Sequence, residues 1–274
     1  MSKDNKDNIV DTTKPSAGRI YDYILGGNHN FEVDRQTADY LINLMPFLTK
    51  IVRLQRWTLQ DIAVELTQRR GYDVIIDFAS GLPTSDHIHP NVPKGTTVIY
   101  SDFDPVVVEY ARDILQNTPD VYYFEADARE PEELLNRPEV LKILGDRRKV
   151  GIAFWGVSAF LRDEEVSRSL RALYDWAAPG SCLALNAQGV GTNPNDPAVV
   201  ELYEIYARNG QPGYHRTLEK FIELCGDWRL DDKGFISLLN WHGFDQSELG
   251  KEEGSPRPPP RKTVYFRAKA VMLF

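Results

Sequence analysis

The chain has 274 residues, of which 42% are hydrophobic and 26% are charged. This size and composition predict one globular domain, or a core domain with a modest appendage. The 32 basic residues are outnumbered by 40 acidic ones, which gives a formal net charge of -8. A nucleic-acid-binding surface needs a basic footprint, so we expect no nucleic-acid partner.

Two cysteines, Cys182 and Cys225, are too few for a disulfide framework or a multi-cysteine zinc site. We expect both to be buried. Residues 1–14 are polar and charged, unlike a signal peptide, and we expect them to be disordered. No apolar run approaches the ~18 residues of a membrane span. These features predict a cytoplasmic protein with no membrane partner.

The first 70 residues predict helices. Ile20, Tyr23 and Ile24 have helical spacing, and Gly26–Gly27 ends that helix. Apolar residues then recur every three or four positions from residue 31 to 70, which predicts two amphipathic helices with Pro46 opening the second. We interpret residues 15–70 as an N-terminal lid and helical cover.

From residue 71 strands alternate with helices, which predicts an α/β fold with a mainly parallel sheet covered on both faces. Residues 71–274 would be the core, forming one structural unit with residues 15–70. The predicted strands are residues 74–78, 97–100, 121–124, 150–155, 182–185, 234–241 and 263–273. The last two lack an obvious helix between them, so we expect them to be antiparallel. The predicted core helices are residues 105–115, 132–144, 164–177, 199–207 and 218–224.

Ligands of such sheets bind outside the carboxyl ends of the strands. The first strand is followed by the small residues Ala79, Ser80 and Gly81, which allow close approach to the backbone. The second strand ends in Ser101–Asp102–Phe103–Asp104. Asp102 lies 21 positions after Gly81, where an acid can accept from both ribose hydroxyls, and Phe103 can cover an adenine.

The third strand leads to Asp127 and Ala128, where a carboxylate can accept from an exocyclic amine and the next N–H can donate to the ring. Each feature alone is weak, because acids after strands are often helix caps. Together they predict an adenosine-type ligand. The turn has Ala79, Gly81 and Thr84 in place of the Gly-x-Gly-x-x-Gly of dinucleotide sites. We therefore favour S-adenosylmethionine as cofactor, with S-adenosylhomocysteine as its product.

Two segments carry a family resemblance. The motifs D-F-A-S-G, D-F-D-P and E-A-D-A resemble the first three motifs of class I S-adenosylmethionine-dependent methyltransferases. Residues 15–35 and 77–89 resemble a bacterial S-adenosyl methyltransferase family, formerly a domain of unknown function. The resemblance implies a Rossmann-like, seven-stranded sheet and cofactor binding, without implying an acceptor. Ala79 replaces the family's usual glycine, which is tolerable if no positive φ is required.

By this resemblance Asp77, Ala79 and Gly81 line the methionine part of the cofactor, and Trp155 and Gly156 lie near its methyl group. The family often has a histidine a few residues later, which is missing here, so we assign no catalytic residue. The remaining assignments are Asp102 to the ribose, Phe103 to the adenine face, and Asp127 with Ala128 to the adenine edge. Ser80 and Asp104, next to these residues in the sequence, are further candidates for cofactor contacts.

The helical cover contributes two further candidates. We expect Tyr21 to contact the cofactor or its pocket as part of a lid, the alternative being a helix cap and loop packed on the core. Arg56 shares a helix face with Arg53 and can meet the methionine carboxylate, the alternative being a solvated helix face.

Other residues favour structural roles. Asp86–His87–x–His89 resembles a metal pair, but a polar loop is the favoured interpretation and we predict no metal. His215 and Arg216 precede a helix, and a cap is favoured over a place in the acceptor pocket. Trp228 and Trp241 are expected to fill core.

These observations predict a methyltransferase that transfers a methyl group in line to a small-molecule acceptor, in a pocket closed by residues 15–35 and 189–216. One alternative is a protein that binds S-adenosylmethionine or S-adenosylhomocysteine without catalysis. A nicotinamide-dependent oxidoreductase is a second alternative. Nothing in the sequence indicates the oligomeric state or the atom methylated.

Overall fold

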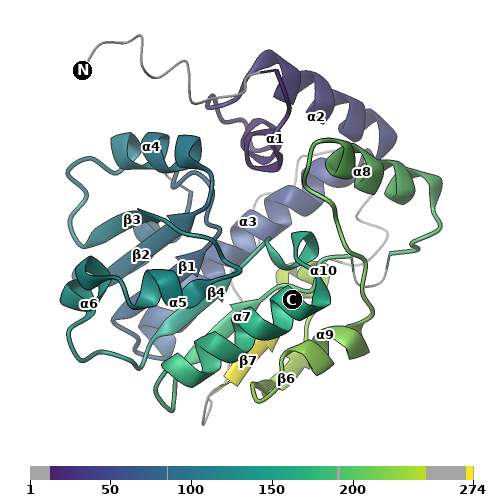
Figure 1. Ribbon diagram of the computed structural model, residues 1–274. Helices are drawn as coiled ribbons and strands as arrows, with labels where there is room; N and C mark the ends of the chain where they lie inside the picture. The colour runs from purple at the N-terminus through teal and green to yellow at the C-terminus, as the bar shows by residue number, and fades with distance from the viewer. Residues whose placement is uncertain (1–12, 85, 190–191, 245–269, 274) are drawn as a thin grey trace.

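The computed structural model describes residues 13–84, 86–189, 192–244 and 270–273, which form an α/β fold around one sheet (Figure 1). The strand order is β3-β2-β1-β4-β5-β7-β6, and every neighbouring pair is parallel. The strands are β1 (Val74–Phe78), β2 (Thr97–Asp102), β3 (Val121–Glu125), β4 (Gly151–Phe154), β5 (Cys182–Leu185), β6 (Arg229–Phe235) and β7 (Ala270–Leu273).

The central strands are apolar because both of their faces are covered. Every residue of β1, β2, β4 and β5 is buried, as expected for parallel strands between two helical layers. Phe78 pairs in register with Ser101 of β2 and with Phe154 of β4. The carboxyl ends of these strands therefore lie together at one edge of the sheet.

Helices cover the sheet with two separate apolar cores. On one face lie α5 (Pro131–Leu135), α6 (Pro138–Leu144), α7 (Asp163–Trp176) and α9 (Leu218–Leu224). On the other face lie α4 (Pro105–Ile114), α10 (Leu238–His242) and the C-terminal half of α3 (Leu48–Val64), which continues as one π-helical turn over Glu65–Arg69. Trp228 and Trp241 are buried in these cores, as are Cys182 and Cys225, which confirms those predictions.

A third core forms a cap above the carboxyl ends of the strands (Figure 1). It joins α1 (Ala17–Ile24), α2 (Glu32–Leu44), the N-terminal half of α3, and α8 (Pro197–Arg208). The amide of Ala17 donates to Gln211 Oε1 at 2.9 Å, which ties the first helix to the segment after α8. The cover is thus built from two distant parts of the chain.

Two predictions at the C-terminal end are wrong. The strand β6 covers Arg229–Phe235, and residues 238–242 form α10 instead of part of a strand, because Ser237 Oγ accepts from the Asn240 amide as an N-cap. Strands β6 and β7 are parallel instead of antiparallel. Residues 263–269 of the last predicted strand lie outside the described residues, as do residues 1–12 of the predicted disordered start.

The predicted helix over residues 132–144 is also incorrect, because it is two helices, α5 and α6. Pro138 cannot continue a helix from its predecessor, and it opens α6 instead. Among the helices that the structure describes, none is long and apolar enough to cross a membrane.

Candidate functional site

The turn after β1 is wound tightly by left-handed backbone. Ala79 has a φ of 52° and Gly81 a φ of 63°. The Ser80 amide fastens the turn to β2 by donating to the Ser101 carbonyl at 2.8 Å. The Ser80 hydroxyl closes the turn on β1 by donating to the Asp77 carbonyl at 2.8 Å. The condition under which alanine would replace the family's glycine without strain is therefore not met, and the conformation costs Ala79 about 1–2 kcal/mol.

Replacing Ala79 with glycine tests this strain. Relief of about 1–2 kcal/mol exceeds the ~0.5–1 kcal/mol by which glycine's greater freedom favours the unfolded chain. We expect Ala79→Gly to leave the free energy of unfolding in urea unchanged or raise it by about 1 kcal/mol. Ala172→Gly, within α7, should instead lower it by about 1 kcal/mol. Equal losses in both variants would contradict a strained Ala79.

Asp77 is a buried carboxyl group without a partner. Its residue is 1% exposed, and neither carboxylate oxygen accepts a hydrogen bond. His87 Nε2 lies 3.9 Å from Asp77 Oδ2. Burial raises the pKa of Asp77 to about 8. The group is therefore mostly protonated at neutral pH, and a cation beside it would favour the ionised form.

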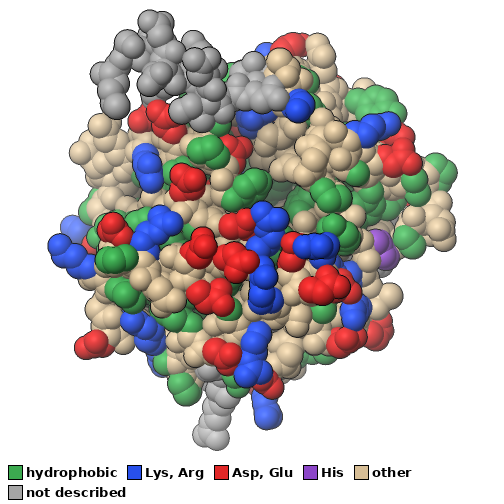
Figure 2. All heavy atoms as spheres, viewed as in Figure 1, with side chains coloured by type: hydrophobic (Ala, Val, Ile, Leu, Met, Phe, Trp, Pro, Cys, Tyr) green, Lys and Arg blue, Asp and Glu red, His purple; other side chains and the backbone are tan. Residues whose placement is uncertain are grey.

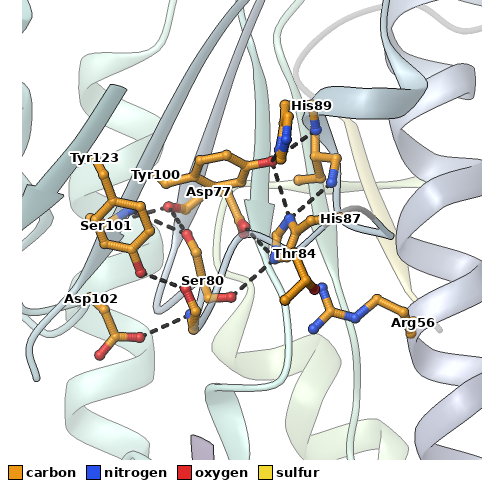
Figure 3. A network of polar contacts seen from close by, with 12 residues as sticks. Arg56, Asp77, Ser80, Thr84, His87, His89, Tyr100, Ser101, Asp102 and Tyr123 are labelled. Carbon is orange, nitrogen blue, oxygen red and sulfur yellow. Dashed lines mark hydrogen bonds and ion pairs between the residues drawn. The ribbon is translucent and has the colours of Figure 1, made fainter. Parts of the chain in front are cut away.

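Arg56 supplies the opposite charge from α3. It is 6% exposed, and its Nε and Nη1 atoms have no hydrogen-bond partner. Its guanidinium lies over the Tyr21 ring at 5.3 Å, and Asp86 Oδ2 is 3.9 Å from Nε. Figure 3 shows the guanidinium pointing from α3 toward the turn that follows β1. A solvated helix face is therefore the wrong interpretation for Arg56.

Tyr21 reaches the same place from α1. Its hydroxyl donates to the Val52 carbonyl at 3.3 Å, and burial raises its pKa. The ring, stacked beside the Arg56 guanidinium, places the first helix of the cap beside the β1 turn. Tyr21, Arg56 and Asp77 thus come together from three elements that are far apart in the sequence.

The two histidines of the following loop meet at Tyr100 (Figure 3). His87 is 1% exposed, its Nδ1 accepts from the Ile88 amide at 2.9 Å, and its Nε2 donates to the Ser80 carbonyl at 3.0 Å. Burial, and then the nearby Arg56 charge, hold its pKa well below the usual range. The neutral His87 ring is therefore buried and supports the turn after β1. The sequence-based interpretation of residues 86–89 as a polar loop did not include this buried role.

Asp102 lies across from the turn at the end of β2. It is 7% exposed, and its two oxygens accept from the Gly81 and Asp104 amides at 3.0 Å each. Burial raises its pKa to about 6. Each oxygen keeps a second acceptor direction for a ribose hydroxyl. The neighbouring Phe103 is 54% exposed, so its ring is open to a ligand.

Asp104 has a structural role at the start of α4. Its Oδ1 accepts from the Val106 amide at 2.9 Å, which makes it the N-cap of that helix. At the end of β3, Arg129 covers Asp127, with its Nε 2.9–3.0 Å from both carboxylate oxygens. Partial burial opposes the change, but the bonds from Arg129 lower the pKa of Asp127. Ala128 is buried, and adenine recognition by this pair stays a prediction.

The ends of β4 and β5 are joined by a residue that the sequence did not single out. Asn186 Oδ1 accepts from the Gly156 amide at 2.8 Å, and its carbonyl accepts from Ser158 Oγ at 2.9 Å. Gly156 has a φ of 79°, a left-handed conformation that favours glycine, and the neighbouring Trp155 is buried. A polar residue after a strand is too common a feature to have revealed Asn186.

Arg216 has a different role from the helix cap that the sequence predicts. The cap of α9 is Thr217, whose Oγ1 accepts from the Lys220 amide at 3.2 Å. Arg216 is 3% exposed and donates to the Ser158 and Leu161 carbonyls and to Asp163. It therefore clamps the loop that follows β4, and a helix-cap role is wrong for it.

The loop between α1 and α2 is organised by Asp22. Its Oδ2 accepts from the His29 amide and from Asn30 Nδ2, both at 2.9 Å. Gly27 lies so close that an added Cβ would be 2.1 Å from Asp22 Oδ1. The His29 ring meets Tyr110 of α4 edge-on, with 5.6 Å between the ring centroids. The loop thus connects the cap to the helix that follows Asp102.

Substituting Gly27 with alanine should disrupt this loop. The added methyl group would displace the Asp22 carboxylate, and overpacking of this kind costs about 1–3 kcal/mol. Gly18→Ala is the matched control, because it lies within α1 with only Ser16 Oγ nearby at 3.9 Å, and it should stabilise by about 0.5–1 kcal/mol. Thermal unfolding of both variants measures the difference, and a neutral Gly27→Ala would refute the close contact.

Comparisons with known proteins agree with this arrangement. A family model described as S-adenosyl methyltransferase matches residues 3–259. The structure of a proposed methyltransferase from Thermobifida fusca YX is 33% identical, with a TM-score of 0.74 over 84% of this chain and 87% of that chain. A DUF574 family protein from Streptomyces avermitilis MA-4680 is 26% identical, with a TM-score of 0.76 over 88% and 93%. A search of curated proteins gives no match.

The parallel sheet, its tight turn after β1 and its covering helices define the class I methyltransferase type of α/β fold. The chain belongs to the S-adenosyl methyltransferase family. This confirms the resemblance of residues 15–35 and 77–89. The ligand roles of the individual residues stay predictions.

Proposed function

We propose that the protein is an S-adenosylmethionine-dependent methyltransferase that binds its cofactor across the carboxyl ends of β1, β2 and β3. The observation that carries the proposal is a pair of buried side chains, Asp77 and Arg56: both carboxyl oxygens of Asp77, and Nε and Nη1 of Arg56, make no hydrogen bond within the described residues. An amino acid is a zwitterion, and the methionine part of the cofactor offers an ammonium to Asp77 and a carboxylate to Arg56. Charge-assisted hydrogen bonds of this kind are strong. Family membership supports the same cofactor.

The chemistry needs little from the protein beyond alignment and exclusion of water. S-adenosylmethionine supplies an activated methyl group on a positive sulfur. A lone pair of the acceptor forms a bond to the methyl carbon, and the carbon–sulfur bond breaks with its electron pair left on sulfur. Any proton on the acceptor atom leaves to water. The cap formed by α1, α2 and α8 covers the strand ends where this occurs.

A small acceptor suits the surface better than a polyanion. Figure 2 shows basic and acidic side chains interleaved on one face of the molecule, without a broad patch of one sign. Surface arginines of α7 are likewise paired with acids, Arg168 with Glu130 and Arg171 with Asp175. A nucleic-acid acceptor would need an uncompensated basic surface.

A ligand pair isolates the role of Arg56. S-adenosylhomocysteine and 5′-methylthioadenosine share the adenosine and the thioether, but only the first has the amino-acid part. We expect Arg56→Gln to weaken S-adenosylhomocysteine by about 2–3 kcal/mol, or about 30- to 150-fold, and to leave methylthioadenosine unchanged. Calorimetric titration measures both affinities. Arg112→Gln, on the surface of α4, is the control, and equal losses for both ligands would refute carboxylate recognition.

Proton release tests the role of Asp77. The free carboxyl group, with its pKa near 8, must ionise when it meets the ligand's ammonium. At pH 7 we expect S-adenosylhomocysteine binding to release close to one proton, and its affinity to rise toward pH 8. Asp102, with a pKa near 6, is already ionised in this range. Titrations in buffers of different ionisation enthalpy count the protons. Asp77→Asn should abolish the release, and an unchanged proton count in that variant would exclude Asp77 as its source.

The raised pKa of Asp77 also predicts how the stability of the ligand-free protein depends on pH. Stability should fall as pH rises, whereas ligand affinity should increase. A carboxyl group whose pKa is raised on folding binds more protons in the native state than in the unfolded chain. The ligand-free protein should therefore lose stability as pH rises from about 5 to 8. Asp77→Asn should lose less over this range. Thermal unfolding across the range measures this, and parallel curves for the two proteins would refute the raised pKa.

A cofactor-binding protein without catalysis is the second candidate. It is favoured by the run Trp155–Gly156–Val157–Ser158 after β4, which contains no general base. Incubating the protein with methyl-labelled S-adenosylmethionine and fractionated small molecules from cell extract separates the two. Tight binding with no labelled product in any fraction would favour the non-catalytic protein. Binding of NAD without binding of S-adenosylmethionine would overturn both.

A further inference from the structure

Asn186 is a buried residue whose side-chain amide is only half used. It directly follows β5 and is 2% exposed. Its Oδ1 accepts from the Gly156 amide at 2.8 Å, and because only the oxygen can accept, this bond fixes which way the amide faces. Within the described residues Nδ2 makes no hydrogen bond, yet the atom is not completely enclosed. Two N–H donors are therefore held in a fixed direction where a small molecule can reach them.

The structural role of Asn186 does not involve this amino group. The Asn186 carbonyl accepts from Ser158 Oγ at 2.9 Å, and the Ser158 carbonyl accepts from Arg216 Nη1 at 2.8 Å. Together with the bond to Gly156, these contacts join the segment after β5 to the loop after β4. Oδ1 and the backbone therefore supply the support, and Nδ2 is left for a ligand.

Strand register places Asn186 at the same edge as the turn after β1. Phe78 pairs with Phe154, and Phe154 pairs with Leu185, so Asn186 lies two strands away from Ala79. At ~4.8 Å between neighbouring strands, that separation is about 10 Å. The proposed cofactor occupies the ends of β1, β2 and β3. The strand order then leaves the ends of β4 and β5 to the acceptor, on the side of the methionine part.

We propose that Asn186 binds the methyl acceptor, and that Nδ2 donates to an oxygen of that molecule in a carbonyl or carboxylate group. This proposal rests on the proposed function, which supplies the methyl donor at the neighbouring strands. An amide nitrogen donates and does not accept, so an ammonium group placed against Nδ2 would gain no bond. A largely buried donor that is left unpaired is costly, which makes the discrimination strong.

Binding of small probes to the protein saturated with S-adenosylhomocysteine tests the proposal. The probes are three sets on the same two rings: benzamide and cyclohexanecarboxamide, benzoate and cyclohexanecarboxylate, and benzylamine and cyclohexylmethylamine. Ligand-observed NMR ranks their affinities. We expect the amides or the carboxylates to bind at least tenfold more tightly than the amines. Which of the two oxygen-bearing sets is tighter shows whether the recognised oxygen is neutral or charged. Preference for the amines, or no binding by any set, would overturn the proposal.

Asn186→Asp changes the donor without changing the shape of the side chain. One carboxylate oxygen can still accept from the Gly156 amide, while the other replaces the two N–H donors. At pH 8 we expect the order of the probes to reverse, with the amines bound more tightly than both oxygen-bearing sets. Asn117→Asp is the control, because it adds the same charge at an exposed position before β3, at the opposite edge of the sheet. The wild-type order in Asn186→Asp would refute recognition by Nδ2.

The two forms of the cofactor test whether Asn186 lies near the transferred methyl group. S-adenosylmethionine carries a positive sulfonium, and S-adenosylhomocysteine does not. At low salt we expect Asn186→Asp to shift the ratio of their affinities at least threefold toward S-adenosylmethionine, because opposite charges attract over this distance. Asn117→Asp should leave the ratio unchanged. An equal effect of Asn186→Asp on both ligands would place Asn186 away from the methyl group and refute its role.

Failure of the proposed function gives a different result. In that case the wild-type protein binds neither S-adenosylmethionine nor S-adenosylhomocysteine, and the probes are compared without them. A probe order that reverses between the wild-type protein and Asn186→Asp would then still establish Asn186 as a binding residue. Binding of both cofactor forms with no reversal would overturn the proposal for Asn186 and leave the proposed function standing.

Discussion

An acid and a base, Asp77 and Arg56, are buried at the carboxyl edge of the sheet with polar atoms that make no hydrogen bond within the described residues. Keeping Asp77 and Arg56 apart from water and short of hydrogen bonds costs stability, which the rest of the structure must supply. The turn after β1 is fastened to β2 by two hydrogen bonds between Ser80 and Ser101, and His87, which contacts Tyr100, donates to the Ser80 carbonyl. The apolar cores on both faces of the sheet hold these elements still. The edge is therefore organised in advance for a ligand that brings both complementary charges.

The cap completes this organisation from the other side. Tyr21 holds the Arg56 guanidinium in place through its ring, and the loop built on Asp22 rests on α4 through His29. Helix α1 and the loop between α1 and α2 thus contact Arg56 and α4 at the edge of the candidate site. The long N-terminal motif shared with the family follows from this, because Gly27, Asp22 and Asn30 are needed together for one compact loop.

The sequence predicts the first five strands of the sheet and the edge at which the candidate site lies, but not the bounds or the pairing of the last two strands. Alternating strands and helices predicted the α/β class, and acids after consecutive strands pointed to one edge, because the ends of parallel strands meet there. Asp104 is the N-cap of α4, a role that the sequence does not distinguish from a ligand contact, because both place an acid directly after a strand. Family membership came from the motifs themselves, while the burial of Arg56 needed the three-dimensional packing of α1 on α3.

Other features depend on long-range contacts and backbone geometry that no local pattern reveals. The positive φ of Ala79 is imposed by bonds between β1 and β2. The apolar residues of 234–241 suit a strand and a helix equally, and Ser237 decides between them through one capping bond. Arg216 looks like an ordinary residue before a helix, yet its partners lie 53 to 58 positions away.

The making of the cap from distant segments has a consequence for how the protein folds. The helices α1 and α2 emerge first during synthesis, but the bond from Ala17 to Gln211 closes a span of 194 residues. Until α8 has been made, Ile20 and Leu41 lack their contact with Ile205. The N-terminal helices must therefore wait with apolar surface open to solvent while β1 to β5 are made, and they gain their partner helix before β6 and β7 complete the sheet.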